Sequence, residues 1–131
     1  FVGVWIRRLL EGQPFEVWGG EQVRDFTFVD DAVEAFLIAA ARPESSGTAY
    51  NLGGPPPITL LQLAKLLVAV NGGGDYTVCE FPAARKKIDI GNYHADDRLI
   101  GRQLGWRPRA SLRVALARTL EYYRRELAHY V

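Results

Sequence analysis

The sequence predicts a mixed α/β fold in a single domain that spans residues 1–131. Two kinds of hydrophobic spacing occur in turn along the chain. A period of two, rich in β-branched and aromatic residues, is typical of strands, whereas apolar residues three and four apart are typical of amphipathic helices. No segment repeats and none has low complexity, so we interpret the chain as one globular domain.

Helical spacing predicts five helices along the chain. Asp30 is expected to cap the second by accepting its free N–H groups, Thr59 and Gln62 form a capping-box pattern before the third, and Ser111 caps the fifth. Gly12 and the glycines after residue 71 suit helix ends because glycine tolerates a positive φ. The predicted helices cover residues 2–11, 30–41, 60–71, 96–104 and 112–127.

Alternating spacing predicts four strands, and the remaining segments are loops by composition. Gly19 and Gly20 suit a tight turn between the first two strands. The charged run 85–90 is expected to be a loop or a short extended segment. The predicted strands cover residues 15–18, 23–29, 48–52 and 76–81.

The charge balance and the cysteine count exclude several classes of protein. A formal net charge of +1 gives no long-range field that would draw nucleic acid or an anionic membrane, so neither is expected as a partner. No apolar run approaches the ~20 residues that span a bilayer. Cys79 is the only cysteine, so no intrachain disulfide forms, and a cytoplasmic location is expected.

The stretch from residue 18 to residue 36 carries the most information. It joins a glycine turn, a strand with Arg24 near its start, and a capped helix. Aromatic residues beside a cation suit a site that stacks a flat ring and holds an anion. They suit an ordinary hydrophobic core equally well, so the spacing alone leaves both interpretations open.

Four motifs in order resemble a known family. The segments EVWGGEQVRDFTFVDDAVEAF, GTAYNLGG, ADDRLIGRQLGWRP and SLRVALARTLEYYR are distributed over the chain from residue 16 to residue 124. Together they resemble the C-terminal part of the NAD-dependent nucleotide-sugar epimerases and dehydratases, which are extended short-chain dehydrogenase/reductase enzymes. UDP-glucose 4-epimerases and dTDP-glucose 4,6-dehydratases belong to this group.

The catalytic apparatus of that family is missing from the sequence. The resemblance implies a glycine-rich turn for NAD and a Tyr-x-x-x-Lys pair in an N-terminal Rossmann half, and neither pattern occurs here. We therefore expect the chain to be the C-terminal substrate-binding portion, without catalytic residues and inactive alone. NAD would serve the intact family enzyme and is not expected to bind this chain by itself.

The resemblance also implies a set of substrate-binding residues. Arg24 matches the family arginine that contacts the substrate diphosphate, and a guanidinium suits that role because it pairs bidentately with phosphate oxygens. Glu16, Val17 and Trp18 match the strand that lines the nucleotide base. Phe26 stands where relatives often place an aromatic residue near uridine. For Trp18 and Phe26, a plain core role is the alternative.

A second segment completes the implied site. Arg85 and Lys86 match the family segment in which a basic residue holds the phosphates, and Asp89 matches the acid that takes the ribose hydroxyls. Relatives commonly show Arg-x-Gly-Asp there, whereas this chain has one more residue and no glycine before Asp89. The departure leaves open which of Arg85 and Lys86 is the phosphate ligand, and a solvated basic loop is the alternative.

Other polar residues are expected to be structural. His94, His129 and Cys79 have no metal-ligand spacing, so no metal site is predicted. The acidic pairs 30–31 and 96–97 each precede a predicted helix, where carboxylates favour the positive end of the dipole.

Two hypotheses of different classes follow. The first is the portion of an NAD-dependent sugar epimerase or dehydratase that binds a nucleotide-diphosphate sugar. The alternative is a non-enzymatic binding or oligomeric assembly module that retains the family fold.

The absence of methionine and the uncapped first helix suggest a piece of a longer polypeptide. An apolar face around Phe28, Phe36 and Leu37 would then be exposed, which predicts a homo-oligomer.

Overall fold

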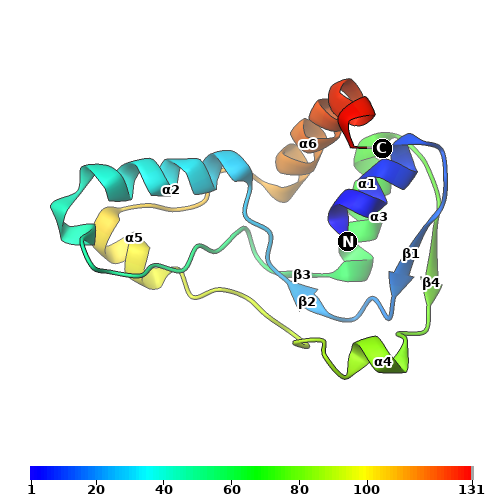
Figure 1. Ribbon diagram of the computed structural model, residues 1–131, viewed down its shortest axis with the longest axis horizontal. Helices are drawn as coiled ribbons and strands as arrows, with labels where there is room; N and C mark the ends of the chain where they lie inside the picture. The colour runs from blue at the N-terminus through cyan, green and yellow to red at the C-terminus, as the bar shows by residue number, and fades with distance from the viewer. Residues whose placement is uncertain (131) are drawn as a thin grey trace.

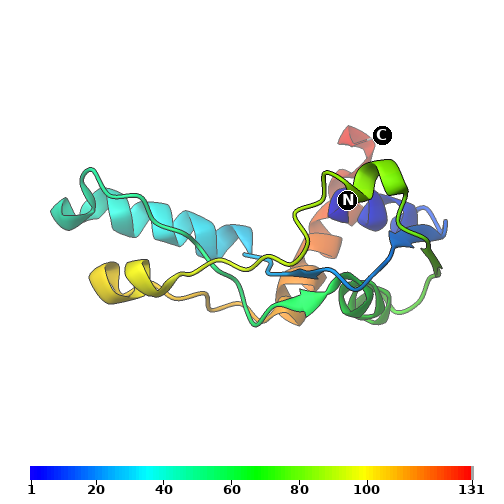
Figure 2. The same ribbon diagram turned by 90° about the horizontal axis from the view of Figure 1, so that it is seen from below.

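The computed structural model describes residues 1–130 and confirms the mixed α/β fold class (Figure 1). The elements form two parts. A main lobe contains α1, β1, α3, β4 and α6, and an arm contains α2, the 3-10 turn η1 and α5 (Figure 2). In chain order the elements are α1 (Val2–Leu10), β1 (Phe15–Trp18), β2 (Val23–Arg24), α2 (Val29–Ala41), η1 (Pro43–Ser45), β3 (Ile58–Thr59), α3 (Leu60–Asn71), β4 (Tyr76–Cys79), α4 (Ala83–Lys86), α5 (Arg98–Leu104), α6 (Leu112–Glu126) and the 3-10 turn η2 (Leu127–His129).

The main lobe is built around a two-stranded parallel sheet. β1 pairs with β4 in the register that sets Phe15 opposite Tyr76 and Trp18 opposite Cys79, and α3 lies in the connection between them. Alternation along β1 buries Phe15 and Val17 and exposes Glu16 and Trp18, because successive side chains point to opposite faces of a strand. The core is formed by Trp5, Ile6, Leu9, Phe15, Val17, Leu60, Leu63, Ala64, Leu67, Leu116 and Leu120.

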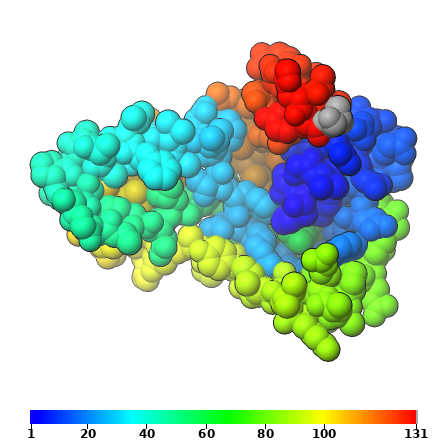
Figure 3. Space-filling model, in the orientation of Figure 1, coloured from blue at the N-terminus to red at the C-terminus, as the bar shows by residue number. Residues whose placement is uncertain are grey.

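The arm has a separate and smaller core, which consists of Ala35, Ile100, Leu104 and Trp106. Trp106 Nε1 donates to the main-chain oxygen of Asp31 over 2.9 Å, and the Asp31 carboxylate accepts from the amide of Ala110 over 3.1 Å. Asp31, the only charged residue that is buried in residues 1–130, thus has one partner for its main-chain oxygen and one for its carboxylate. The space-filling view shows the cyan arm projecting away from the lobe that contains α1 and α6 (Figure 3).

A short antiparallel pair joins the two parts. β2 and β3 pair Val23 with Thr59 and Arg24 with Ile58. Nearby, a Cβ at Gly54 would overlap the backbone carbonyl of Phe26, so the close approach of these two segments requires glycine.

Three of the four strand predictions need correction, because a strand persists only where a partner supplies its hydrogen bonds. The strand expected over 23–29 is limited to Val23–Arg24, and the strand expected over 76–81 ends at Cys79. Residues 48–52 form no strand. The segment expected to be a loop or extended over 85–90 instead contains the last residues of α4. Only the strand over 15–18 has the predicted bounds.

The helix caps follow the sequence at some ends and not at others. The Thr59–Gln62 capping box is present, Ser111 Oγ accepts from the amide of Val114, and Gly72 ends α3 with a φ of 82°. The prediction for Asp30 is wrong. α2 begins at residue 29, and the Asp30 carboxylate pairs with Arg118 over 2.7 Å.

The two residues of the second acidic pair, Asp96 and Asp97, differ in the contacts they make with α5. The Asp96 carboxylate accepts from the amide of Arg98 in the first turn of α5, as expected for an acid before a helix. Asp97, which occupies the N-cap position itself, makes no capping hydrogen bond. None of the helices in residues 1–130 has the length and apolar character that crossing a bilayer requires.

Candidate functional site

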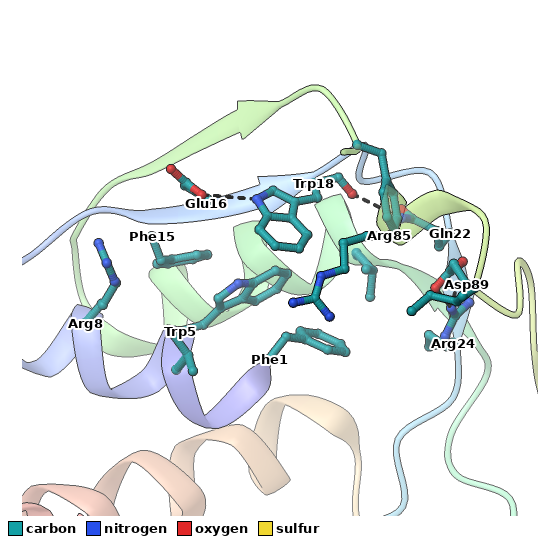
Figure 4. Close-up of a pocket in the computed structure, with 14 residues that line it drawn as sticks. Phe1, Trp5, Arg8, Phe15, Glu16, Trp18, Gln22, Arg24, Arg85 and Asp89 are labelled. Carbon is teal, nitrogen blue, oxygen red and sulfur yellow. Dashed lines mark hydrogen bonds and ion pairs between the residues drawn. The ribbon is translucent and has the colours of Figure 1, made fainter. Parts of the chain in front are cut away.

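A concave pocket of about 550 Å³ lies between α1, β1 and the segment that carries α4 (Figure 4). It collects five of the eight residues predicted to bind substrate, which come from segments far apart in sequence: Glu16, Trp18, Arg24, Arg85 and Asp89. β1 presents the first two, β2 the third, and the chain in and after α4 the last two.

The other three predicted residues lie elsewhere. Val17 is fully buried in the main-lobe core, because it occupies the inward position of β1. Phe26 packs partly buried against the same core, with its ring 6.4 Å from that of Phe1. Lys86 lines an adjoining hollow of about 260 Å³, which it shares with Asp89. None of the three side chains lines the main pocket.

Glu16 and Trp18 act as a pair on the outward face of β1. The indole Nε1 of Trp18 donates to Glu16 Oε2 over 3.1 Å, because residues two apart on a strand share a face. The Trp18 side chain keeps 38% of its surface exposed, and its ring centroid lies 6.3 Å from that of Phe81. The indole is therefore fixed at its edge while part of its surface stays open to the pocket.

Two aromatic side chains at the start of the chain, Phe1 at the N-cap of α1 and Trp5 within the helix, line the same pocket. The Trp5 ring stacks on Phe15 with centroids 5.0 Å apart, and the Phe1 ring meets Trp5 edge-on, also at 5.0 Å. Sequence reasoning assigned this segment only to an amphipathic helix. The signal it passed over is that Phe1 and Trp5, four residues apart, are both aromatic and lie on one helical face.

Arg24 and Asp89 form an ion pair at the pocket wall. Arg24 Nη2 donates to the two carboxylate oxygens of Asp89 over 3.0 and 3.3 Å, and Nη1 donates to the main-chain oxygens of Val23 and Gly91. The resemblance implied separate ligand contacts for Arg24 and Asp89. In the structure the Arg24 guanidinium donates to the Asp89 carboxylate, so the two side chains are partners of one another.

Arg85 and Lys86 are consecutive residues of α4, and their side chains line different hollows. The Arg85 side chain points into the main pocket, toward the region where Trp5 and Trp18 lie (Figure 4). Its guanidinium makes no hydrogen bond or ion pair with any part of residues 1–130. Lys86 faces the adjoining hollow instead. Of the two alternatives left open by the sequence, Arg85 is the one that faces the main pocket.

Gln22 is a pocket residue that the sequence analysis did not single out. Its Oε1 accepts from the amide of Gly20 over 3.0 Å, and its Nε2 donates to the main-chain oxygen of Trp18 over 3.1 Å. Gly19 and Gly20 adopt φ values of 70° and 89°, as the turn prediction required. The Gln22 side chain thus braces the turn that sets Trp18 relative to Arg24.

Two surface pairs outside the pocket shift pKa values. Hydrogen bonds from the Arg98 side chain and main chain hold the pKa of the Asp96 carboxyl well below its ordinary value. A hydrogen bond with the Tyr130 hydroxyl raises the pKa of Tyr122 above its ordinary value. Within the described part of the chain, no group of three or more His, Cys, Asp and Glu side chains is arranged to hold a metal ion.

The pocket combines two chemical features. Trp18 and Phe1, which are 38% and 57% exposed, offer apolar, planar surfaces, and Arg85 offers a guanidinium without a protein partner among residues 1–130. A flat aromatic ligand can stack on the aromatic side chains, and phosphate oxygens can pair with the Arg85 guanidinium.

Comparison with known proteins gives a consistent set of similarities. The model of the NAD-dependent epimerase/dehydratase family matches residues 1–53. UDP-D-apiose/UDP-D-xylose synthase 1 of Arabidopsis thaliana is 34% identical over 136 residues, which include 94% of this chain and 35% of that protein. The chain thus spans about a third of the length of this curated relative.

Solved structures agree in fold. A UDP-glucose 4-epimerase of Thermotoga maritima, solved with UDP-glucose, superposes with a TM-score of 0.77 at 31% identity, over 96% of this chain and 40% of that one. A dTDP-glucose 4,6-dehydratase of Streptomyces venezuelae, solved with NAD, superposes with a TM-score of 0.80 at 26% identity, over 98% of this chain and 39% of that one.

Proposed function

Since this chain belongs to the NAD-dependent epimerase/dehydratase family, we propose that it forms the portion that binds a nucleotide-diphosphate sugar. The observation that carries the proposal is the pocket of about 550 Å³, which combines the exposed indole of Trp18 with the guanidinium of Arg85. The base would stack against the aromatic side chains, and the diphosphate would pair with the arginine. Both contacts are remote from the sugar carbon that reacts, so they supply binding energy rather than chemistry.

We further propose that the chain binds no NAD and has no activity by itself. A dinucleotide requires a strand, a glycine-rich turn and a helix whose N-terminus meets the pyrophosphate. Within residues 1–130 the glycine run 72–74 follows α3 and precedes β4, which is the reverse order. The residues present therefore do not fit that cofactor, and no step of hydride transfer is assigned to them.

The alternative function, an assembly module, is favoured by one specific observation. Along α2 the apolar side chains of Val29, Val33, Phe36 and Leu37 are 62%, 49%, 73% and 66% exposed. Their spacing places them on one helical face. Because a contiguous exposed apolar face favours association, self-association through α2 remains our prediction for this chain in solution.

A cytoplasmic location, and the absence of a nucleic-acid partner, also stay predictions.

Calorimetric titration with UDP, dTDP, GDP and NAD tests the binding proposal. Arg85→Gln is the informative variant, because the Arg24 side chain is committed to main-chain oxygens and its removal would disturb the loop. Arg113→Gln on the exposed face of α6 is the matched control. We expect one nucleoside diphosphate to bind, with about tenfold or greater weakening in Arg85→Gln and no change in the control.

Two results would contradict the proposal. One is the absence of binding by all three nucleoside diphosphates. The other is equal affinity of the wild type and the Arg85→Gln variant for the nucleotide that binds. Binding of NAD with an affinity similar to that of the nucleoside diphosphate would contradict the proposal that this chain binds no NAD.

A further inference from the structure

The Arg24–Asp89 pair fixes a negative charge beside one of the cations of the pocket. The two side chains are only 14% and 24% exposed, and their closest atoms are 3.0 Å apart. Solvent and salt screen a partly buried pair less than an exposed one. An anion that binds Arg24 must therefore compete with the Asp89 carboxylate, which already pairs with the guanidinium.

The carboxylate is held in place by the backbone around it. Asp89 Oδ2 accepts from the amide of Gly91 over 2.9 Å. The following residues are tied to β2, because the amide of Val23 donates to Asn92 Oδ1 over 2.9 Å and the amide of Tyr93 donates to the oxygen of Val23 over 3.0 Å. Asp89 is thus a preorganised counter-ion rather than the tip of a freely moving side chain.

The remaining cations of the pocket are placed differently. Arg85 has no carboxylate partner within residues 1–130, and Arg8 donates to the main-chain oxygen of Pro14. A phosphate that enters the pocket can pair with Arg85 at once. It can pair with Arg24 only by displacing Asp89.

We propose that Asp89 is a specificity-determining residue that competes with ligand phosphate for Arg24 and thereby weakens the binding of small free anions. Inorganic phosphate or pyrophosphate offers only ionic contacts to compensate for the displaced carboxylate. A nucleoside diphosphate adds stacking on the aromatic side chains, so it tolerates the competition. This inference rests on the proposed function, because it concerns the same pocket.

Titration with inorganic pyrophosphate at fixed ionic strength tests the competition. Asp89→Asn keeps the shape of the side chain and an oxygen for the amide of Gly91, and it removes the charge. We expect the affinity for pyrophosphate to rise about tenfold in this variant, as for other close charge pairs. Glu80→Gln, on the same segment but outside the pocket lining, is the matched control and should leave the affinity unchanged.

A second pair of variants shows whether the effect passes through Arg24. In an Arg24→Gln background, adding Asp89→Asn should change the pyrophosphate affinity much less than it does in the wild type. A gain of full size in that background would overturn the proposal, because Asp89 would then repel anions without competing for Arg24. Unchanged or lower affinity in Asp89→Asn, or no measurable pyrophosphate binding by any variant, would also overturn it.

Two additions keep the test decisive. Thermal unfolding checks that each variant folds, and Asp89→Ser, which retains a side-chain oxygen acceptor, replaces Asp89→Asn if the latter does not fold. Parallel titration with UDP and dTDP separates the two proposals. Nucleotide binding without a pyrophosphate gain would overturn this inference alone, whereas absence of nucleotide binding would contradict the proposed function.

Discussion

Replacing Ile100 by alanine should unfold the arm and leave the main lobe folded. Three large side chains, Ile100, Leu104 and Trp106, are 1%, 5% and 2% exposed and make up most of the arm core. Each contributes about 1.5–3 kcal/mol on burial. Removing the buried Ile100 side chain to alanine costs about 2–5 kcal/mol.

That cost is large for a core of this size. Ordering the backbone of each residue opposes folding by about 1–2 kcal/mol, so little net stability remains to the arm. The exposed residues of α2, such as Phe36 and Leu37, add no burial in the isolated chain. The main lobe, in contrast, has eleven buried residues in its core and does not use Ile100.

Amide hydrogen exchange is the suitable assay, because it reports opening element by element. In the wild type we expect slower exchange in α3 than in α2. In Ile100→Ala the amides of α2 and α5 should exchange rapidly while those of α3 keep their protection. Arg102→Ala, at an exposed position of α5 and outside the apolar face of α2, is the control and should change neither. Simultaneous loss of protection in α2 and α3 would refute the separation into two cooperative units.

Three further predictions concern single side chains. Phe36→Glu should reduce the self-association seen by light scattering at high concentration, whereas Val114→Glu, at an exposed apolar site of α6, should not; a strict monomer in the wild type would refute this. Thr59→Ala removes the capping box of α3 and should lower the free energy of unfolding by about 1 kcal/mol in urea titration, and no change would contradict the cap assignment. Asp96 has a depressed pKa in the folded chain, so the stabilisation it gives is present above its ordinary pKa of 3.8 and is lost as the pH falls toward the folded value. Carboxyl NMR titration should therefore place the midpoint of Asp96 below 3.8, and Arg98→Gln should return it toward 3.8.

Local signals in the sequence predicted the elements whose causes are local. The capping box at Thr59 and the positive φ at Gly19 and Gly20 depend on neighbours a few residues away. The strand over 15–18 has the predicted bounds because β4 pairs with it along its whole length. The same alternation over 23–29 predicted too long a strand, since pairing with β3 stops after Arg24.

The site shows the same division between local and distant causes. A motif predicted that Trp18 and Arg85 matter, and both line the pocket. No pattern in the sequence gave the contact between Arg24 and Asp89, which are 65 residues apart. Val17 was included because it lies in the matching strand, yet the period of two turns its side chain into the core.

The placement of the pocket determines which changes can affect binding. Its walls come from the start of the chain and α1, from β1, β2 and the turn between them, from the first residue of α3, and from the segment 81–89, and none of the arm helices contributes a residue. A variant that unfolds the arm should therefore retain nucleotide binding if the main lobe holds the site by itself. Titrating UDP and dTDP into Ile100→Ala would decide this, and loss of binding would mean that the arm orders β2 or the residues around Asp89. The folding of the arm and the pocket would then be coupled through the short β2–β3 pair, which is the hydrogen-bonded ladder nearest the junction of the two parts.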